Sequence, residues 1–186
     1  NGDKFCSWNN FRSLKINKIV GKKWCTKRSI KFSYLVIIYM GKVIEIAISQ
    51  SLKGKMESVN SIQVIAGEGI IKDRHLKKNN DKKNQITLIE IENIKYYNRV
   101  AKTLIKSIDF RRNIITEGIK LNQLLGKEFV IGEVKLKAHD LCRPCKYLQE
   151  RLKQKDFIKE MLHKGGIRCE ILTNGIINVG SKVANE

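Results

Sequence analysis

The segment from Leu141 to Lys146, Leu-Cys-Arg-Pro-Cys-Lys, holds the residues of this chain that are best suited to chemistry. It lies between a predicted strand and a predicted helix, so Cys145 falls near the N-terminus of that helix. The partial positive charge of a helix N-terminus favours a thiolate, and the neighbouring Arg143 and Lys146 act in the same direction. Pro144 fixes one backbone dihedral and so stiffens the presentation of the thiol. Such a thiolate could bind a soft metal or carry sulfur as a persulfide.

The same spacing also has a structural interpretation, in which Cys142 and Cys145 are half-buried and have no chemical role. A single C-x-x-C does not decide between the two interpretations. A structural zinc site is disfavoured, because it needs four ligands and the sequence has no second C-x-x-C. His139 and His163 could complete a ligand set, but their spacing matches no standard zinc pattern.

An Arg-Arg-Asn run opens a predicted short strand within residues 110–118. Arg111 and Arg112 each offer a planar fork of donors, and together with Asn113 they could grip a phosphate or the edge of a pterin. A solvated basic turn is the alternative interpretation.

Residues 67–75 form a predicted loop with two glycines, followed by Asp73, Arg74 and His75. This loop could line a pocket, with Arg74 and His75 as binding residues, or it could make a surface ion pair. The sequence contains no Ser/His/Asp order, no Walker loop and no G-x-G-x-x-G, and it shows no suggestive pair of carboxylates.

The elements that must position these residues are mostly short strands. Residues 41–49, 60–66 and 85–91 are β-rich runs bounded by glycine or polar residues. Apolar residues at helical spacing then predict one amphipathic helix; they are Ile91, Ile94, Tyr97, Ala101, Leu104 and Ile105.

The second half of the chain is punctuated by turns. A short helical turn over 121–125 should stop at Gly126, and the apolar parity of 129–138 switches at Gly132, which indicates a turn or bulge. Asn174-Gly175 between two apolar runs predicts a β-hairpin. Two short helices are also expected, over Lys146–Leu152 and Asp156–His163, with Gly165-Gly166 as a stop. The pattern predicts a mainly β (α+β) fold, a closed or nearly closed barrel with a few helices outside.

Composition is that of a globular protein, with 42% hydrophobic and 30% charged residues. The net charge is +19, which suits either a solvated lysine-rich surface or an anionic partner such as a phosphorylated cofactor or nucleic acid. Aromatic residues make up only 7% and do not interleave with the basic ones, so a nucleic-acid-binding barrel is the less favoured alternative.

Residues 1–39 differ from the rest, because both tryptophans, Trp8 and Trp24, occur there without clear periodicity. They hold nine Lys/Arg and one Asp, a net charge of +8. We take Met40 as the natural start, residues 1–39 as an upstream basic extension that is not native, and residues 40–186 as the domain. A genuine basic arm is the alternative.

The five cysteines have no ordered spacing and are odd in number, which is typical of a reducing cytoplasm and not of a disulfide framework. The longest apolar stretch, 34–40, is too short to span a membrane and lacks a cleavage site of small residues. A cytoplasmic protein without a membrane partner is expected.

Taken together, four segments resemble the MOSC domain of the molybdenum-cofactor sulfurase family, in its small, stand-alone bacterial type. They are GEGIIKDRH (67–75), RRNIITEGIKLNQLLGKEFVIGEVKL (111–136), LCRPCKYL (141–148) and GGIRCEILTNGIINVGSKV (165–183). Their order and spacing fit over about residues 40–186. Lys72 stands where the family usually has glycine.

The resemblance implies a β-barrel that binds molybdenum cofactor (molybdopterin) or carries activated sulfur; the family is also associated with pyridoxal phosphate binding. It assigns Cys145 as the molybdenum ligand or sulfur carrier, and Arg111 and Asn113 as cofactor contacts. Arg112, Arg74, His75 and Cys142 are the weaker members of the set. If the protein is an enzyme, it would be a molybdenum-cofactor-dependent oxidoreductase or a sulfur-transfer protein. It would then need a partner protein that donates electrons or sulfur, since the chain has no flavin, haem or iron–sulfur motif.

Overall fold

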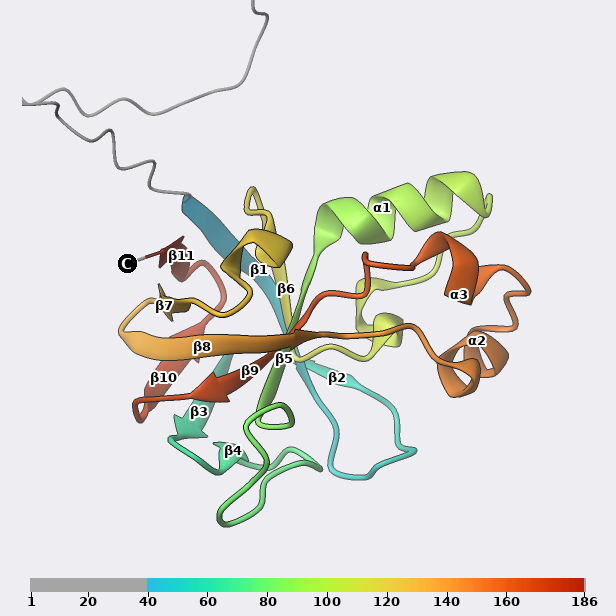
Figure 1. The fold of residues 1–186 in the computed structure, drawn as a ribbon. Coiled ribbons are helices and arrows are strands. Elements are labelled where there is room, and N and C mark those ends of the chain that lie inside the picture. Colours follow the sequence, from blue (N-terminus) through green and yellow to red (C-terminus); the bar gives the residue numbers. More distant parts are fainter. Residues whose placement is uncertain (1–39, 186) are drawn as a thin grey trace, which may run out of the picture. The chain divides into compact units, whose positions relative to one another are not determined.

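The computed structural model describes residues 40–185, and their centre is a closed barrel of seven strands (Figure 1). Around the barrel the strands follow in the order β1 (Met40–Ile48), β6 (Ile114–Glu117), β5 (Ile86–Glu90), β9 (Ile167–Ile171), β8 (Val134–Leu141), β7 (Glu128–Ile131) and β11 (Lys182–Asn185). Strand β11 pairs with β1 and closes the circle. All these pairings are antiparallel except β5 with β6. The expected mainly β barrel is confirmed.

Strand β1 is long enough to pair with three partners along its length. Met40–Lys42 pairs with β11, the middle pairs with β6, and Ile46–Ile48 pairs with the short strand β2 (Glu57–Val59). A separate three-stranded sheet has the order β10 (Gly175–Asn178), β3 (Ser61–Ile65) and β4 (Gly69–Ile70).

The core is formed in two parts. The larger fills the barrel with alternate aliphatic side chains of each strand, as in β9, where Ile167, Cys169 and Ile171 are all buried. The smaller part lies under the helices and contains Tyr97, whose ring meets Phe157 edge-on at a centroid distance of 5.2 Å. This second core packs the helices against the outside of the barrel strands.

Three short helices, α1 (Ile91–Val100), α2 (Lys146–Leu152) and α3 (Phe157–Glu160), lie together on one side of the strands (Figure 1). Two 3-10 turns, η1 (Ser107–Phe110) and η2 (Leu121–Leu124), complete the elements. The bounds of α2 and the turn before Gly126 agree with the prediction, whereas α3 is shorter than predicted. Within the described residues no helix is long and apolar enough to cross a membrane.

Gly132 was expected to mark a turn or bulge, and it lies in the tight connection between β7 and β8. Its φ of +60° is in the left-handed region, where glycine carries no Cβ penalty. Ile131 and Val134 pair directly across the turn. The parity switch is therefore confirmed as a β-hairpin.

The prediction of a hairpin at Asn174-Gly175 is wrong. Strand β9 pairs with β5 and β8, while β10 pairs with β3, so the two runs that flank the Asn-Gly pair belong to different sheets. The Oδ1 atom of Asn174 accepts a hydrogen bond from the backbone N–H of Ala66 at 2.7 Å, which ties the connection to the end of β3. The turn residues therefore carry the chain from one sheet to the other.

The predicted amphipathic helix also ends earlier than expected. Helix α1 stops at Val100, and Leu104, which we placed on the buried stripe, is 97% exposed. The side-chain amide of Asn98 bonds both backbone groups of Ile105, with its Nδ2 donating and its Oδ1 accepting. These bonds replace the next helical turn and bring Ile105 back to the core by a loop.

The predictions for residues 1–39, including Trp8 and Trp24, concern a stretch outside the described residues.

Candidate functional site around Cys145

Strand β8 ends at Leu141 and leads directly into the segment with the two cysteines. The N–H of Cys142 donates to the carbonyl of Gly166 at 2.8 Å, which continues the pairing of β8 and β9 by one residue. Cys145 is the residue immediately before α2, and its carbonyl accepts bonds from Leu148 and Gln149 at 3.1 Å. The expected place of Cys145 at the start of a helix is confirmed.

Two glycines allow this segment to pack closely against the barrel. A Cβ on Gly165 would lie 2.0 Å from the carbonyl oxygen of Cys142, and one on Gly166 would lie 1.9 Å from the carbonyl oxygen of Leu88. A side chain at Gly165 would push the cysteine segment away, and one at Gly166 would push the start of β9 away from β5. The prediction that Gly165-Gly166 stops a helix is wrong, because α3 already ends at Glu160. The two glycines instead allow close backbone approaches, of Gly165 to Cys142 and of Gly166 to Leu88 in β5.

Cys145 is exposed and lies at the edge of a hollow of ≈ 190 Å³, which we call the Cys145 hollow. Its lining comes from four separate stretches of the chain: Leu52; Arg74 and His75; Arg111 and Arg112; Cys145, Tyr147 and Leu148. Five of the seven predicted site residues thus meet in one place. The other two, Asn113 and Cys142, are buried and do not line the hollow.

Arg111 and Arg112 have different tasks in the wall of the hollow. Arg111 adopts a left-handed backbone at the end of η1, and its guanidinium donates to the carbonyl of Gly54 at 2.5 Å and of Leu52 at 2.7 Å. It thereby anchors the 50–54 loop, which joins β1 to β2. Arg112 donates from Nε to the carbonyl of Gly165 at 2.8 Å and so holds the loop that precedes β9.

Arg74 is the third guanidinium, and its side chain is 7% exposed. Among the described residues, the side chain of Arg74 donates hydrogen bonds only from Nη1, to Sδ of Met56 at 3.1 Å and to Oδ2 of Asp73 at 3.5 Å. Burial lowers the pKa of Arg74, and the charges of Arg111 and Arg112 lower it further while Asp73 opposes them. The lining holds no carboxylate, so the hollow is positive and partly desolvated, which favours an anion.

His75 lies beside Arg74 in the lining. Burial lowers the pKa of His75 from 6.5, and the charge of Arg74 lowers it further. The imidazole is therefore neutral near pH 7 and has a nitrogen that can accept a proton.

The side chain of Asn113 bonds neighbouring strands and loops and does not line the hollow. Its Oδ1 accepts from the N–H of Thr87 at 3.2 Å and from the Thr87 hydroxyl at 2.8 Å. Its Nδ2 donates to the carbonyl of Ala47 at 3.3 Å and to Oδ2 of Asp73 at 3.2 Å. The side chain is thus fully bonded to protein, one layer behind the arginines.

Cys142 and Cys169 are both buried, and their thiols are close enough to influence each other. Burial raises the pKa of Cys169 well above 9.0, with a smaller contribution from Cys142. Of the three cysteines in the described part of the chain, all are free and only Cys145 is exposed. Cys142 faces away from the hollow although it shares the C-x-x-C segment.

Sequence reasoning missed two parts of this site. The 50–54 loop, with Leu52, carries no motif, and it is held at the hollow by the Arg111 guanidinium, which donates to the carbonyls of Leu52 and Gly54. The start of α2 also contributes Tyr147 and Leu148, and their place just after Cys145 is a signal that could have found them.

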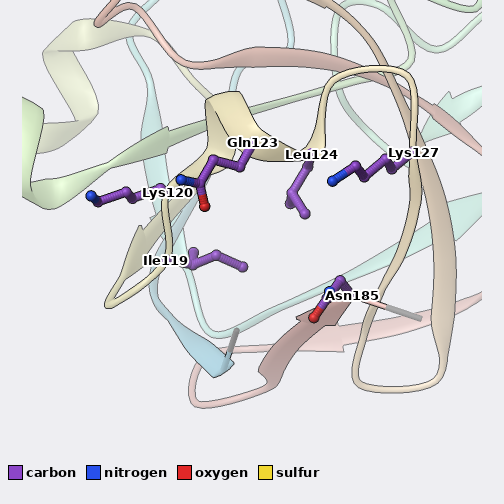
Figure 2. A pocket seen from close by; sticks show the side chains of 6 residues that line it. All are labelled: Ile119, Lys120, Gln123, Leu124, Lys127 and Asn185. Carbon is purple, nitrogen blue, oxygen red and sulfur yellow. The ribbon is translucent and has the colours of Figure 1, made fainter. Parts of the chain in front are cut away.

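A larger cavity of ≈ 380 Å³ lies elsewhere on the barrel (Figure 2). It is lined by Ile119, Lys120, Gln123, Leu124, Lys127 and Asn185. These residues include no thiol, carboxylate or imidazole, so the chemistry-bearing residues lie with the smaller hollow. Among the residues that the structure describes, no three His, Cys, Asp or Glu are grouped as a metal site.

A family model for the MOSC domain matches residues 72–184, a stretch that includes every lining residue of the Cys145 hollow except Leu52. The match covers more than half of the chain, and the chain therefore belongs to the MOSC domain family. No curated protein sequence matches it.

Solved structures with the same fold include the YuaD protein from Bacillus subtilis, with a TM-score of 0.68 and 16% sequence identity over 79% of this chain and 96% of YuaD. YiiM from Geobacillus stearothermophilus aligns with a TM-score of 0.61 and 17% identity, covering 78% of this chain and 75% of YiiM. YiiM from Escherichia coli gives 0.59 and 16%, covering 78% and 69%. At these identities the likeness concerns the fold.

Proposed function

We propose that this MOSC domain binds the molybdenum cofactor at the Cys145 hollow. The observation that carries the proposal is the meeting of an exposed thiol with three guanidinium groups in one hollow. Cys145 would be the molybdenum ligand, while Arg74, Arg111 and Arg112 would attract the anionic end of the cofactor. Arg111 would do so while it holds the 50–54 loop.

The donor set fits this group. A thiolate is a ligand for soft metals, and guanidinium groups bind phosphate through paired donors. The hollow is smaller than the roughly 300–1,000 Å³ of ordinary ligand pockets, so it would take one end of the cofactor and not the whole pterin. When bound, the cofactor supplies redox chemistry, and the electrons would come from a partner protein. His75, neutral and in the lining, would accept a proton there.

A sulfur carrier is the second candidate, favoured by the exposure of Cys145. The Cys145 thiolate would attack the terminal sulfur of a donor persulfide. A new S–S bond forms at Cys145, the S–S bond of the donor breaks, and the donor leaves as a thiolate. The transferred sulfur keeps its oxidation level, so the step needs no further oxidant.

Other ligands have less support from the described residues. Tyr147 is the one aromatic side chain of the described chain that is exposed, so no row of rings is available to stack bases. Pyridoxal phosphate is usually held through a lysine amine, and the hollow is not lined by lysine.

Molybdenum analysis of the protein purified from cells grown with molybdate tests the first candidate. We expect the unaltered protein to retain molybdenum and Cys145→Ser to lose it with an unchanged melting temperature. Cys169→Ser, in the barrel interior, is the control for a general effect of cysteine loss.

Incubation with a small persulfide, followed by intact-protein mass spectrometry, tests the sulfur-carrier candidate: a gain of one sulfur atom should depend on Cys145. Protein that retains no molybdenum and accepts no sulfur would overturn both candidates.

A further inference from the structure

Asp73 is a buried carboxylate directly behind the Cys145 hollow, and its side chain is 2% exposed. Its Oδ1 accepts from the N–H of His75 at 3.0 Å. Its Oδ2 accepts from the N–H of Ser49 at 3.2 Å and from Nδ2 of Asn113 at 3.2 Å, and it lies 3.5 Å from Nη1 of Arg74. Every described polar neighbour of this carboxylate is a donor.

These bonds join three stretches of chain that line or support the hollow. Ser49 follows β1 and precedes the 50–54 loop, and its carbonyl in turn accepts from the N–H of Arg74 at 2.7 Å. Asn113 follows the two arginines of the 111–112 wall. Lys72, just before Asp73, has a φ of +66°, so the turn has a backbone that a non-glycine residue adopts at a cost. The bonds of Asp73 offset that cost.

Asn113 sets the orientation of the carboxylate. Because Thr87 holds the Oδ1 end of its amide, the Nδ2 end must face Asp73. These hydrogen bonds form a chain. Thr87 orients Asn113, and Asn113 orients Asp73. Asp73 in turn contacts Arg74 and His75.

We propose that Asp73 is the positioning residue of the Cys145 hollow, holding Arg74 and His75 in its wall, with Asn113 fixing the carboxylate. The role deepens the proposed function and rests on it, because it specifies how the hollow keeps its anion-binding shape. An alternative role for Asp73 is purely electrostatic, as a negative charge that offsets part of the positive charge of the arginines.

The two roles predict opposite results for Asp73→Asn. Loss of the charge alone would make the hollow more positive. In the positioning role, the new amide places at least one N–H against a donor, whichever way it turns, because both carboxylate oxygens accept bonds. The turn then releases Arg74, and the hollow becomes less positive at Cys145.

The probe is a pair of thiol alkylators, iodoacetate and iodoacetamide, which differ in charge. The measured quantity is the iodoacetate rate divided by the iodoacetamide rate at Cys145, each followed by mass spectrometry of the Cys145 peptide. Because both reagents react with the same thiolate and only iodoacetate is charged, this ratio rises with positive potential at Cys145. We expect the ratio in the folded, cofactor-free protein to exceed the ratio in the urea-unfolded chain. Asp73→Asn should lower it, by roughly threefold if the effect of one charge at short range in water is lost. A ratio that rises in Asp73→Asn would overturn the proposal.

The controls separate position from charge and from folding. Asp140→Asn removes a charge from the half-buried Asp140, near the end of β8 and outside the lining of the hollow, and should not lower the ratio. Asp73→Glu keeps the charge but displaces the carboxylate by one methylene; the positioning role predicts a lower ratio and the electrostatic role an unchanged one. Arg74→Gln should lower the ratio, and adding Asp73→Asn to it should lower it little further.

Ratios are compared only between variants that show a cooperative melting transition. If Asp73→Asn has none, Asp73→Glu decides, and if neither folds, an Arg74→Gln ratio equal to the unaltered one contradicts the proposal. Because no cofactor is present, failure of molybdenum loading leaves this result intact.

Discussion

Cys142 and Cys145 are separated by two residues, yet the first is 2% exposed and the second is exposed at the edge of the Cys145 hollow. The N–H of Cys142 still pairs with Gly166 as part of the barrel wall, whereas Cys145 already belongs to the start of α2. One C-x-x-C segment therefore supplies a core residue and a surface thiol.

The first prediction is a ranking of thiol reactivity. In the folded protein, Cys145 should be alkylated roughly a hundredfold faster than Cys169, which reacts only when the barrel opens. Cys142 should be protected in the same way. Peptide-level mass spectrometry of timed iodoacetamide labelling measures the three rates separately. Equal rates at Cys145 and Cys169 would remove the basis of the site assignment.

The second prediction concerns the 50–54 loop. Arg151 on α2 donates to the carbonyl of Lys53 at 3.0 Å and of Gly54 at 3.4 Å, next to the bonds from Arg111. Arg151→Gln should loosen the loop and speed trypsin cleavage after Lys53 by about fivefold, as expected for the loss of hydrogen bonds worth roughly 1 kcal/mol. Gel or mass analysis of a digestion time course gives the rate. Arg99→Gln, in the last turn of α1, is the matched control, and an unchanged rate in Arg151→Gln would show that Arg111 holds the loop alone.

The third prediction concerns Gly166, which has a φ of +87° and no room for a side chain. Gly166→Ala should lower the free energy of unfolding by about 3 kcal/mol or more, because backbone strain and overlap with Leu88 add together. Gly126 has a similar φ of +76° with open space around it, so Gly126→Ala should cost roughly 1 kcal/mol through strain alone. Urea unfolding measures both, and equal losses would contradict the close approach of Gly166 to β5.

The fourth prediction concerns Glu90, which is buried at the start of α1. Burial raises the pKa of Glu90 above 4.5, although hydrogen bonds, including one from the N–H of Leu121, oppose the shift. The folded state then binds the Glu90 proton more tightly than the unfolded state. The stability that comes from protonated Glu90 is fully present below pH 4.5 and is lost as the pH rises through the raised pKa.

Glu90→Gln removes this titration, so its melting temperature relative to that of the unaltered protein should rise between pH 4 and pH 7. Thermal unfolding followed by circular dichroism at several pH values measures the difference. Glu150→Gln, on the exposed face of α2, is the control and should show little change in its difference with pH. A Glu90→Gln difference that is flat or falls with pH would contradict the assignment.

Much of the site could be predicted from the sequence, because local rules govern it. A strand, a short C-x-x-C segment and a helix over Lys146–Leu152 follow from periodicity and turn chemistry within about a dozen residues. The parity switch at Gly132 is equally local. Residue type alone marks five residues as candidates, and the barrel brings them together: Cys145, Arg111, Arg112, Arg74 and His75.

What only the tertiary structure decided is which neighbours each residue meets across the chain. The Asn174-Gly175 pair is a good hairpin turn by itself, but the bond from Ala66 and the pairing of β10 with β3 send the chain to another sheet. Asn113 looks like a ligand contact until Thr87 and Asp73, 26 and 40 residues away, satisfy its amide. Sequence by itself determined which residues can do chemistry, because side-chain type and local spacing are encoded residue by residue. Whether each faces the hollow or the core was decided by long-range hydrogen bonds and barrel closure, which no local pattern encodes.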